Sequence, residues 1–163
     1  MYKVTQTKVV IRDKDNNIIR NGNCYPAVIA SLMELPIEDV PNFEVFYSLS
    51  KNHSFWIDVM TKWLEGHHKE INSDYRFHAW HPEISFPVTI QDRLMLDGET
   101  EIDMLTRLRL ETKDKYYLGS GPSSRGVNHI CIYINGELAW DPHPSREGLL
   151  YIDEFSTLED IRF

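Results

Sequence analysis

The chain has 163 residues and a mass of 19.2 kDa, the size of one domain with its own hydrophobic core. Apolar residues make up 42% of it and charged residues 26%, which excludes an intrinsically disordered protein. The net charge is -8, which argues against a general nucleic-acid binder. No apolar run approaches the roughly 20 residues that span a bilayer, and the N-terminus lacks a signal-peptide core. We therefore expect a single domain over residues 1–163 that is soluble and cytoplasmic and contacts neither nucleic acid nor a membrane.

The N-terminal part of the chain predicts a hairpin followed by a buried helix. Residues 3–11 are rich in β-branched side chains and predict a strand, and residues 18–19 begin a return strand. The Asp/Asn-rich stretch 13–17 between them is typical of a turn. Asn23 is the candidate N-cap of a helix through residues 27–35. Because this helix is apolar nearly all round, we expect it to be buried.

The rest of the chain predicts one more helix and then a sheet. Residues 54–66 carry bulky apolar side chains at helical spacing. Residues 100–110 fit either a helix capped by Thr100 or a strand. The expected strands are 75–80, 116–118, 129–134, 137–141 and 149–152, with a Gly/Pro/Ser-rich loop at 119–128. A helical first half and an antiparallel sheet in the second half predict an α+β fold.

Cys24 is the candidate nucleophile of a thiol enzyme. It follows a Gly-Asn step at the start of the expected helix, where unpaired N–H groups and the helix dipole favour a thiolate. His129, at the start of a predicted strand, is the candidate base, and Asp141, at the end of the next strand, is the candidate group that orients it. A nucleophile, a base and an orienting carboxylate make a catalytic triad. The plainer alternative is that Cys24 is a small buried apolar residue.

The hairpin between the two strands decides whether His129 and Asp141 share a face. A two-residue loop at 135–136 would turn them to opposite faces, whereas a three-residue loop at 134–136 with a left-handed glycine would set them directly opposite each other. We expect the three-residue loop, because it also gathers the apolar side chains of the hairpin on the other face. Those side chains are Ile130, Ile132, Leu138 and Trp140.

Cys131 would then lie beside Ala139, on the same face as His129. We expect a packed core thiol there, since cysteine behaves as a small apolar residue when buried. A disulfide between Cys131 and Cys24 is disfavoured in a reducing cytosol.

Several segments resemble known proteins. The stretch Asn21-Gly22-Asn23-Cys24-Tyr25-Pro26-Ala27 resembles the Gly-x-Cys-aromatic start of papain-like proteins. His129 with the later Asp141-Pro142 step resembles the arrangement in bacteriocin-leader peptidases and transglutaminase-like enzymes. Residues 22–24, 34–43, 121–129 and 141–145 together resemble a group of uncharacterised bacteriophage proteins. The resemblance implies a papain-like fold, in which a helix carrying the Cys packs on an antiparallel sheet carrying the His and Asp.

The expected activity is that of a cysteine-dependent hydrolase or acyltransferase acting on amide, peptide or isopeptide bonds without a cofactor. Papain-like enzymes usually have an oxyanion-stabilising Gln about six residues before the Cys, where this chain has Ile18. Gln6 takes that role if residues 8–20 form a hairpin insertion that brings it back, and Asn21 and Asn23 are alternatives. The backbone N–H of the nucleophile would be the second donor.

Two similar loops flank the hairpin and offer candidate substrate-binding groups. Arg125 and Arg146 would form a fork that holds a carboxylate or phosphate, with Ser123 and His143 nearby. The plainer interpretation is turn residues with solvated arginines. The expected substrate is a peptide or a small amide-containing molecule, and the fork would favour an anionic one.

No metal site is expected, because the remaining histidines lack a partner pair at a known zinc spacing. These histidines are His67, His68, His78, His81 and His143. His78 and His81 would face opposite sides of a strand. The alternative to an enzyme is a non-enzymatic, phage-encoded protein that blocks a host protein or captures a small anionic ligand, with the chemistry idle.

Overall fold

The computed structural model describes residues 1–45, 55–76, 79–81, 86–88, 97–100, 103, 106–107, 110, 112–152 and 154–161. The chain forms two compact units, and each is described by itself. The first consists of Met1–Glu70, Pro142–Arg146 and Glu159–Phe163, and the second of Ile71–Asp141 and Glu147–Leu158. The expectation of a single domain over residues 1–163 stays a prediction.

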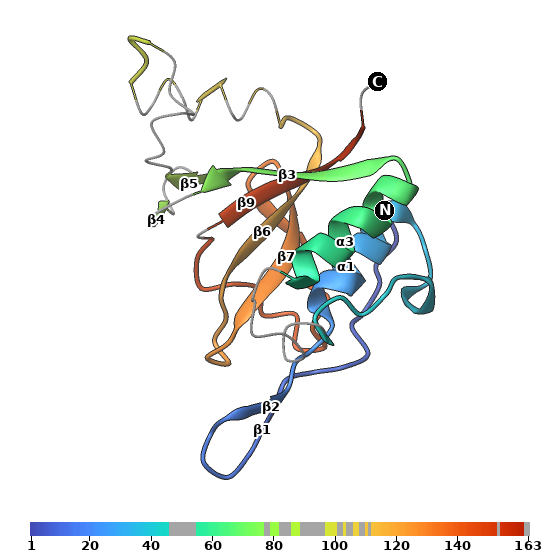
Figure 1. Ribbon diagram of the computed structural model, residues 1–163. Helices are drawn as coiled ribbons and strands as arrows, with labels where there is room; N and C mark the ends of the chain where they lie inside the picture. Colours follow the sequence, from blue (N-terminus) through green and yellow to red (C-terminus); the bar gives the residue numbers. More distant parts are fainter. Residues whose placement is uncertain are drawn as a thin grey trace. The chain divides into compact units, whose positions relative to one another are not determined.

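The secondary structure combines helices with antiparallel strands, which confirms the α+β class (Figure 1). The helices are α1 (Cys24–Met33) and α3 (Phe55–Gly66), with a 3-10 turn η1 (Ile37–Asp39). The strands are β1 (Ile11–Arg12), β2 (Ile18–Arg20), β3 (Lys69–Arg76), β4 (Ala79–His81), β5 (Phe86–Val88), β6 (Tyr116–Pro122), β7 (Asn128–Ile134), β8 (Glu137–Trp140) and β9 (Glu154–Asp160). A five-stranded sheet has the order β3-β9-β6-β7-β8, and β1-β2 and β4-β5 form two-stranded sheets. None of the helices in the described part of the chain has the length and apolar character to cross a membrane.

Helix α1 is buried along most of its length, as its apolar sequence predicts. Its residues from Ala27 to Ala30 have no exposed surface, and they form the core of the first unit together with Phe43 and Leu64. Ser31 is the polar exception, and its hydroxyl donates to the Ala27 carbonyl at 2.8 Å. This bond removes the cost of burying a hydroxyl group in an apolar helix.

Residues 3–11 do not form the predicted strand, because within this stretch the pairing with β2 begins only at the short β1. The backbone N–H groups of Thr7 and Lys8 instead donate to the side-chain oxygen of Asn23, at 3.0 and 2.8 Å. A side chain from another segment therefore replaces the neighbouring strand. The predicted turn between β1 and β2 is confirmed, and the Asp13 carboxylate accepts two backbone N–H groups there, which lowers the pKa of Asp13.

Strand β6 is longer than predicted and takes in the first part of the expected loop at 119–128. The glycine signal was misleading, because Gly119 serves packing and not a turn. A Cβ atom at Gly119 would lie 2.8 Å from the side chains of Tyr133 and Ile152. The absence of a side chain at Gly119 therefore lets those two side chains pack directly against the backbone of β6.

The predicted strand at 149–152 is wrong, since the last strand of the sheet is β9, which pairs with β6. Leu150 donates its N–H to the carbonyl of Pro122 at 2.8 Å, and Ile152 is buried. The apolar pattern of this stretch therefore reflects irregular backbone packed on the core.

The predictions for residues 75–80 and 100–110 fall partly outside the described residues. Within the described part, β3 and β4 cover both ends of the first stretch. The cap of the second stretch is confirmed, because the Asp103 N–H donates to the Thr100 hydroxyl at 3.2 Å and the Thr100 N–H donates to the Asp103 carboxylate at 3.0 Å.

Candidate functional site

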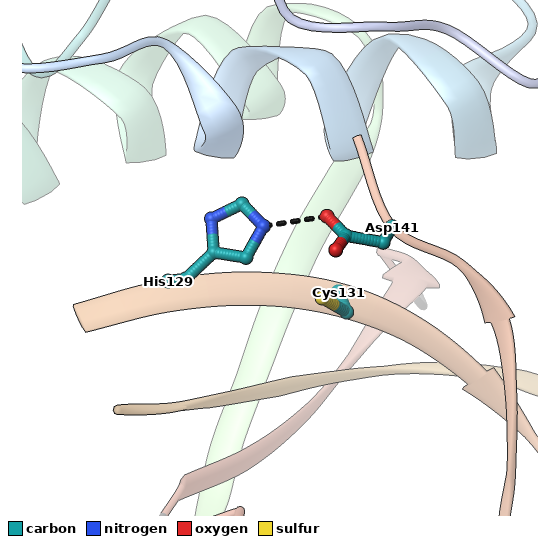
Figure 2. Close-up of side chains that lie close together, drawn as sticks. All are labelled: His129, Cys131 and Asp141. Atoms are coloured by element: carbon teal, nitrogen blue, oxygen red, sulfur yellow. Dashed lines mark hydrogen bonds and ion pairs between the residues drawn. The ribbon is translucent and has the colours of Figure 1, made fainter. Parts of the chain in front are cut away.

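His129 and Asp141 form a buried pair in the second unit (Figure 2). Nε2 of His129 lies 2.6 Å from Oδ1 of Asp141, and the two residues are 5% and 2% exposed. The other carboxylate oxygen accepts the N–H of Gly148 at 2.8 Å. Because Nε2 is engaged with the carboxylate, any proton exchange of His129 with a third group would go through Nδ1.

The hairpin that carries this pair turns through two residues, so the predicted three-residue loop is wrong. Ile134 pairs with Glu137, and Asn135 and Gly136 form the turn with φ values of 51° and 82°. Two successive positive φ values are typical of a type I′ turn, which the Asn-Gly sequence strongly favours. The turn chemistry therefore prevails over the register that the apolar pattern suggested.

A β-bulge then restores the shared face. The register shifts between Tyr133, which pairs with Leu138, and Ile132, which pairs with Trp140. Ala139 is thus an extra residue on β8, and one extra residue turns everything after it to the other face. Asp141 consequently lies on the face of His129, as expected, although by a different route.

Two details of the predicted register are wrong as well. Leu138 pairs with Tyr133 and is exposed, so it does not belong to the apolar face with Ile132. Continuing the ladder by one residue sets Cys131 opposite Asp141 and not opposite Ala139, and Figure 2 shows the Cys131 side chain beside that carboxylate. The two-residue turn explains the position of Leu138, and the turn together with the bulge explains that of Cys131.

Strand β6 shapes the other side of this face. It places Gly121 opposite His129 and Gly119 opposite Cys131, so no side chain of β6 competes for the space beside the imidazole and the thiol. Farther along, the rings of Tyr117 and Tyr133 stack with centroids 5.8 Å apart, and burial raises the pKa of both phenols. The His129–Asp141 pair and this tyrosine pair are both buried.

Cys24 is the first residue of α1 and belongs to the first unit. Its thiol is half-buried and donates to Oε1 of Glu44 at 3.6 Å. The N–H of Tyr25 also donates to this carboxylate. Burial raises the pKa of Glu44 to about 7, although both hydrogen bonds act in the opposite direction. Cys24 and Cys131, both within the described residues, are thiols and do not form a disulfide.

Asn23 occupies the predicted N-cap position, but its side chain does not cap the helix. It is turned toward the N-terminal segment, where its amide also donates to the Thr7 hydroxyl at 2.9 Å. The carboxylate of Glu44 instead accepts a first-turn N–H group, as capping side chains do. Sequence reasoning missed Glu44, because it lies 20 residues after Cys24 and no spacing rule connects the two.

Gln6 is brought back to the start of α1 in the way its predicted role requires. Residues 8–20 form the insertion, and the N–H of Asn23 donates to the carbonyl of Lys8 at 3.1 Å. The buried amide nitrogen of Gln6 lies 3.1 Å from the place of a Cβ on Gly22 and donates to Lys8 at 2.7 Å. An amide has two N–H groups, so this bond uses one of them. Asn21 is partly exposed next to this point.

The predicted substrate-binding residues each have a local partner. These residues are Arg125, Arg146, His143 and Ser123. Arg125 pairs with Glu147 at 3.7 Å, and Arg146 donates to the Thr5 hydroxyl. The His143 ring lies 2.9 Å from the Ser145 hydroxyl, and the Ser123 hydroxyl donates to the Val127 carbonyl. A substrate anion would compete with Glu147 for Arg125, so the arginine fork stays a prediction.

No family model, curated protein or solved structure matches this chain. Its function has to be inferred from the residues themselves. Cys24 lies in the first unit and the His129–Asp141 pair in the second.

Proposed function

We propose that the chain is a papain-like cysteine hydrolase or acyltransferase with Cys24, His129 and Asp141 as its triad. The observation that carries the proposal is the buried 2.6 Å contact between Nε2 of His129 and Asp141. A carboxylate placed in this way fixes the tautomer and orientation of an imidazole and stabilises the imidazolium that forms during catalysis. Burying such a pair costs free energy unless its remaining polar atoms have hydrogen-bond partners. Here the N–H of Gly148 donates to the second carboxylate oxygen of Asp141.

The reaction would proceed by acyl transfer through the thiol. Nδ1 of His129 takes the proton of Cys24 as the sulfur bonds to the substrate carbonyl. The same proton passes to the leaving amine when the tetrahedral intermediate collapses, which leaves a thioester on Cys24. Water or a second amine then attacks the thioester, its proton goes to His129, and the thiolate leaves.

Two groups near the start of α1 support the oxyanion part of this mechanism. The N–H of Cys24 is at the helix N-terminus, where N–H groups have no intrahelical acceptor. The Gln6 amide lies next to Gly22 and retains a second N–H group. Donors aimed at a developing oxyanion are worth about 3–4 kcal/mol each in related chemistry.

Chain connectivity also supports the proposal. Pro142 follows Asp141 directly, and its carbonyl accepts the N–H of Gln6 at 2.9 Å. The next residues of that N-terminal segment bind the side chain of Asn23, which precedes Cys24. The segment after the orienting carboxylate and the segment before the nucleophile therefore share one hydrogen-bond network. For a phage-encoded enzyme, the place of action would be the host cytoplasm and the substrate an amide, peptide or isopeptide.

Acylation by p-nitrophenyl acetate tests the proposal without knowledge of the natural substrate. We expect a burst of p-nitrophenol and one acetyl group on Cys24, found by peptide mass spectrometry. Cys24→Ala and His129→Ala should abolish the burst, whereas Cys131→Ala, which removes the other thiol, should keep it. A wild-type protein without a burst, or a burst that survives Cys24→Ala, would contradict the proposal.

The contact between Cys24 and Glu44 favours a second candidate function. A carboxylate 3.6 Å from the sulfur repels a thiolate, which fits a protein whose Cys24 stays protonated. Such a protein would act by binding a host factor or a small anionic ligand. If Cys24→Ala retains the full biological effect of the wild type, this second function replaces the first.

A further inference from the structure

We propose that His129, Cys131 and Asp141 together bind a divalent transition-metal ion, with Cys131 as its thiolate ligand. One potential ligand atom from each residue lies within 4.8 Å of the other two (Figure 2). All three residues belong to the second unit. The proposal goes beyond acyl transfer, because it gives Cys131 a role and does not involve Cys24.

The local chain geometry makes this cluster. His129 and Cys131 are two residues apart on β7, so both side chains project from the same face of the strand. The bulge at Ala139 turns Asp141 to that face. Because β7 is paired with β6 on one side and β8 on the other, its two ligands stand on a rigid element.

The donor set fits zinc better than the common hard cations. Imidazole, thiolate and carboxylate are the three ligand types that Zn²⁺ takes in proteins, and three protein ligands leave one position open for water. The thiolate disfavours Mg²⁺ and Ca²⁺, which prefer oxygen. The sequence did not suggest this site, because the residue that completes it is positioned by a bulge and not by a recognisable spacing.

Metal binding requires only a small movement of the pair. Metal–ligand bonds of about 2.0–2.3 Å put tetrahedral ligand atoms roughly 3.3–3.7 Å apart. The 2.6 Å separation between His129 and Asp141 must therefore open. The thiol proton of Cys131 leaves to solvent, and the imidazole proton of His129 is exchanged from Nε2 to Nδ1, so that the neutral imidazole binds the metal through Nε2. The N–H of Gly148 donates to the second oxygen of Asp141. Hydrogen bonds of this kind orient carboxylate ligands in metal sites.

An ion at this site would also regulate the proposed enzyme. An imidazole that ligates the metal no longer exchanges protons with a thiol, so the metal-bound form would be inactive. This consequence rests on the proposed function, whereas metal binding itself does not. Binding to the protein without substrate therefore tests the site separately.

The test is a titration of metal-free protein with Zn²⁺ in competition with a chromophoric chelator. We expect one bound equivalent of Zn²⁺ for the wild type and an affinity at least about tenfold lower for Cys131→Ala. Residues that only hydrogen-bond to a metal ligand already change metal affinity by about that factor, so losing a ligand should cost at least as much. Cys24→Ala is the matched control, because it removes the other thiol and should bind like the wild type. With Co²⁺, the thiolate charge-transfer absorption should appear in the wild type and in Cys24→Ala and be missing in Cys131→Ala.

Three results would overturn the site: no binding by the wild type, wild-type affinity in Cys131→Ala, or loss of binding in Cys24→Ala. If circular dichroism shows that Cys131→Ala does not fold, Cys131→Val, which also lacks a ligand atom but fills more of the space, is judged by the same affinity criterion. Acylation of Cys24 is measured in the presence of EDTA, so the metal site and the acyl chemistry can fail independently.

Discussion

Glu44 directly affects the chemistry of Cys24. Its carboxyl oxygen Oε1 accepts a hydrogen bond from the thiol, with the sulfur 3.6 Å away, and burial raises the pKa of Glu44 to about 7. Below that pH the carboxyl is neutral and leaves the thiolate unopposed, whereas above it the carboxylate repels a negative sulfur. The reactivity of Cys24 should therefore respond to the protonation of Glu44 near neutral pH.

The same residue makes stability depend on pH. A carboxyl whose pKa is 4.5 when unfolded and about 7 when folded stabilises the folded state below pH 4.5, and this advantage is lost as pH rises through 7. We expect the wild type to lose on the order of 3 kcal/mol relative to Glu44→Gln between pH 4.5 and pH 8, at about 1.4 kcal/mol per pKa unit. Urea unfolding of both proteins across this range measures the difference.

The matched control for Glu44→Gln is Glu38→Gln, which removes an exposed carboxylate from η1 in the same unit. It should keep the pH dependence of the wild type. Parallel stability curves for the wild type and Glu44→Gln would show that burial does not perturb Glu44 in the folded protein.

At the scale of elements, the bulge in β8 decides whether the site exists. A two-residue turn alone would send His129 and Asp141 to opposite faces, and the one extra residue, Ala139, reverses that outcome. Bulges of this kind re-aim side chains next to functional sites. The hairpin therefore lacks an unbroken ladder of paired residues, and the interruption places His129 and Asp141 on one face.

Deleting Ala139 should regularise the ladder and separate the pair. The downfield proton resonance of the His129 imidazole N–H should disappear, and the free energy of unfolding should fall by about 3–5 kcal/mol, because a buried charge loses its partner. Ala139→Ser keeps the residue count and should retain the resonance. A deletion variant that still shows the resonance would contradict the role of the bulge.

Replacing glycine by alanine should have opposite effects on stability in strand β6 and in helix α3. Gly119→Ala would place a methyl group 2.8 Å from Tyr133 and Ile152, so we expect a loss of about 1–3 kcal/mol in the free energy of unfolding. Gly66, the last residue of α3, has open space around its Cβ position. Gly66→Ala should stabilise the protein by up to about 1 kcal/mol. Unfolding midpoints in urea compare the two, and equal shifts would show that β6 does not need glycine for close packing.

At the scale of the whole molecule, the sequence predicts the elements that carry a strong local pattern and misses those set by distant partners. Helix α3 and strand β7 are recognisable from their apolar spacing, and helix α1 from its nearly unbroken apolar run. The N-terminal segment is not, since its backbone partner is the side chain of Asn23. A side-chain partner from a distant segment has no signature in the sequence of the stretch that it binds.

The candidate site divides in the same way. Its chain order is predictable, because the residue types needed for acyl transfer stand at the ends of recognisable elements. The shared face of His129 and Asp141 is expected from the apolar pattern, but by way of a three-residue loop that the hairpin does not have. The bulge at Ala139 and the contact with Glu44 are not predictable, because each depends on how segments meet in three dimensions. These two features decide how the candidate residues act.

Alkylation of Cys24 by iodoacetamide at about pH 6, well below the ordinary thiol pKa of ~8.5, tests the central claim most directly. Peptide mass spectrometry in the presence of EDTA gives separate rates for Cys24 and Cys131. The triad predicts that Cys24 reacts far faster than Cys131 and that His129→Ala slows Cys24 to the rate of an ordinary thiol. Equal and slow labelling of both cysteines, or a Cys24 rate unchanged by His129→Ala, would contradict it.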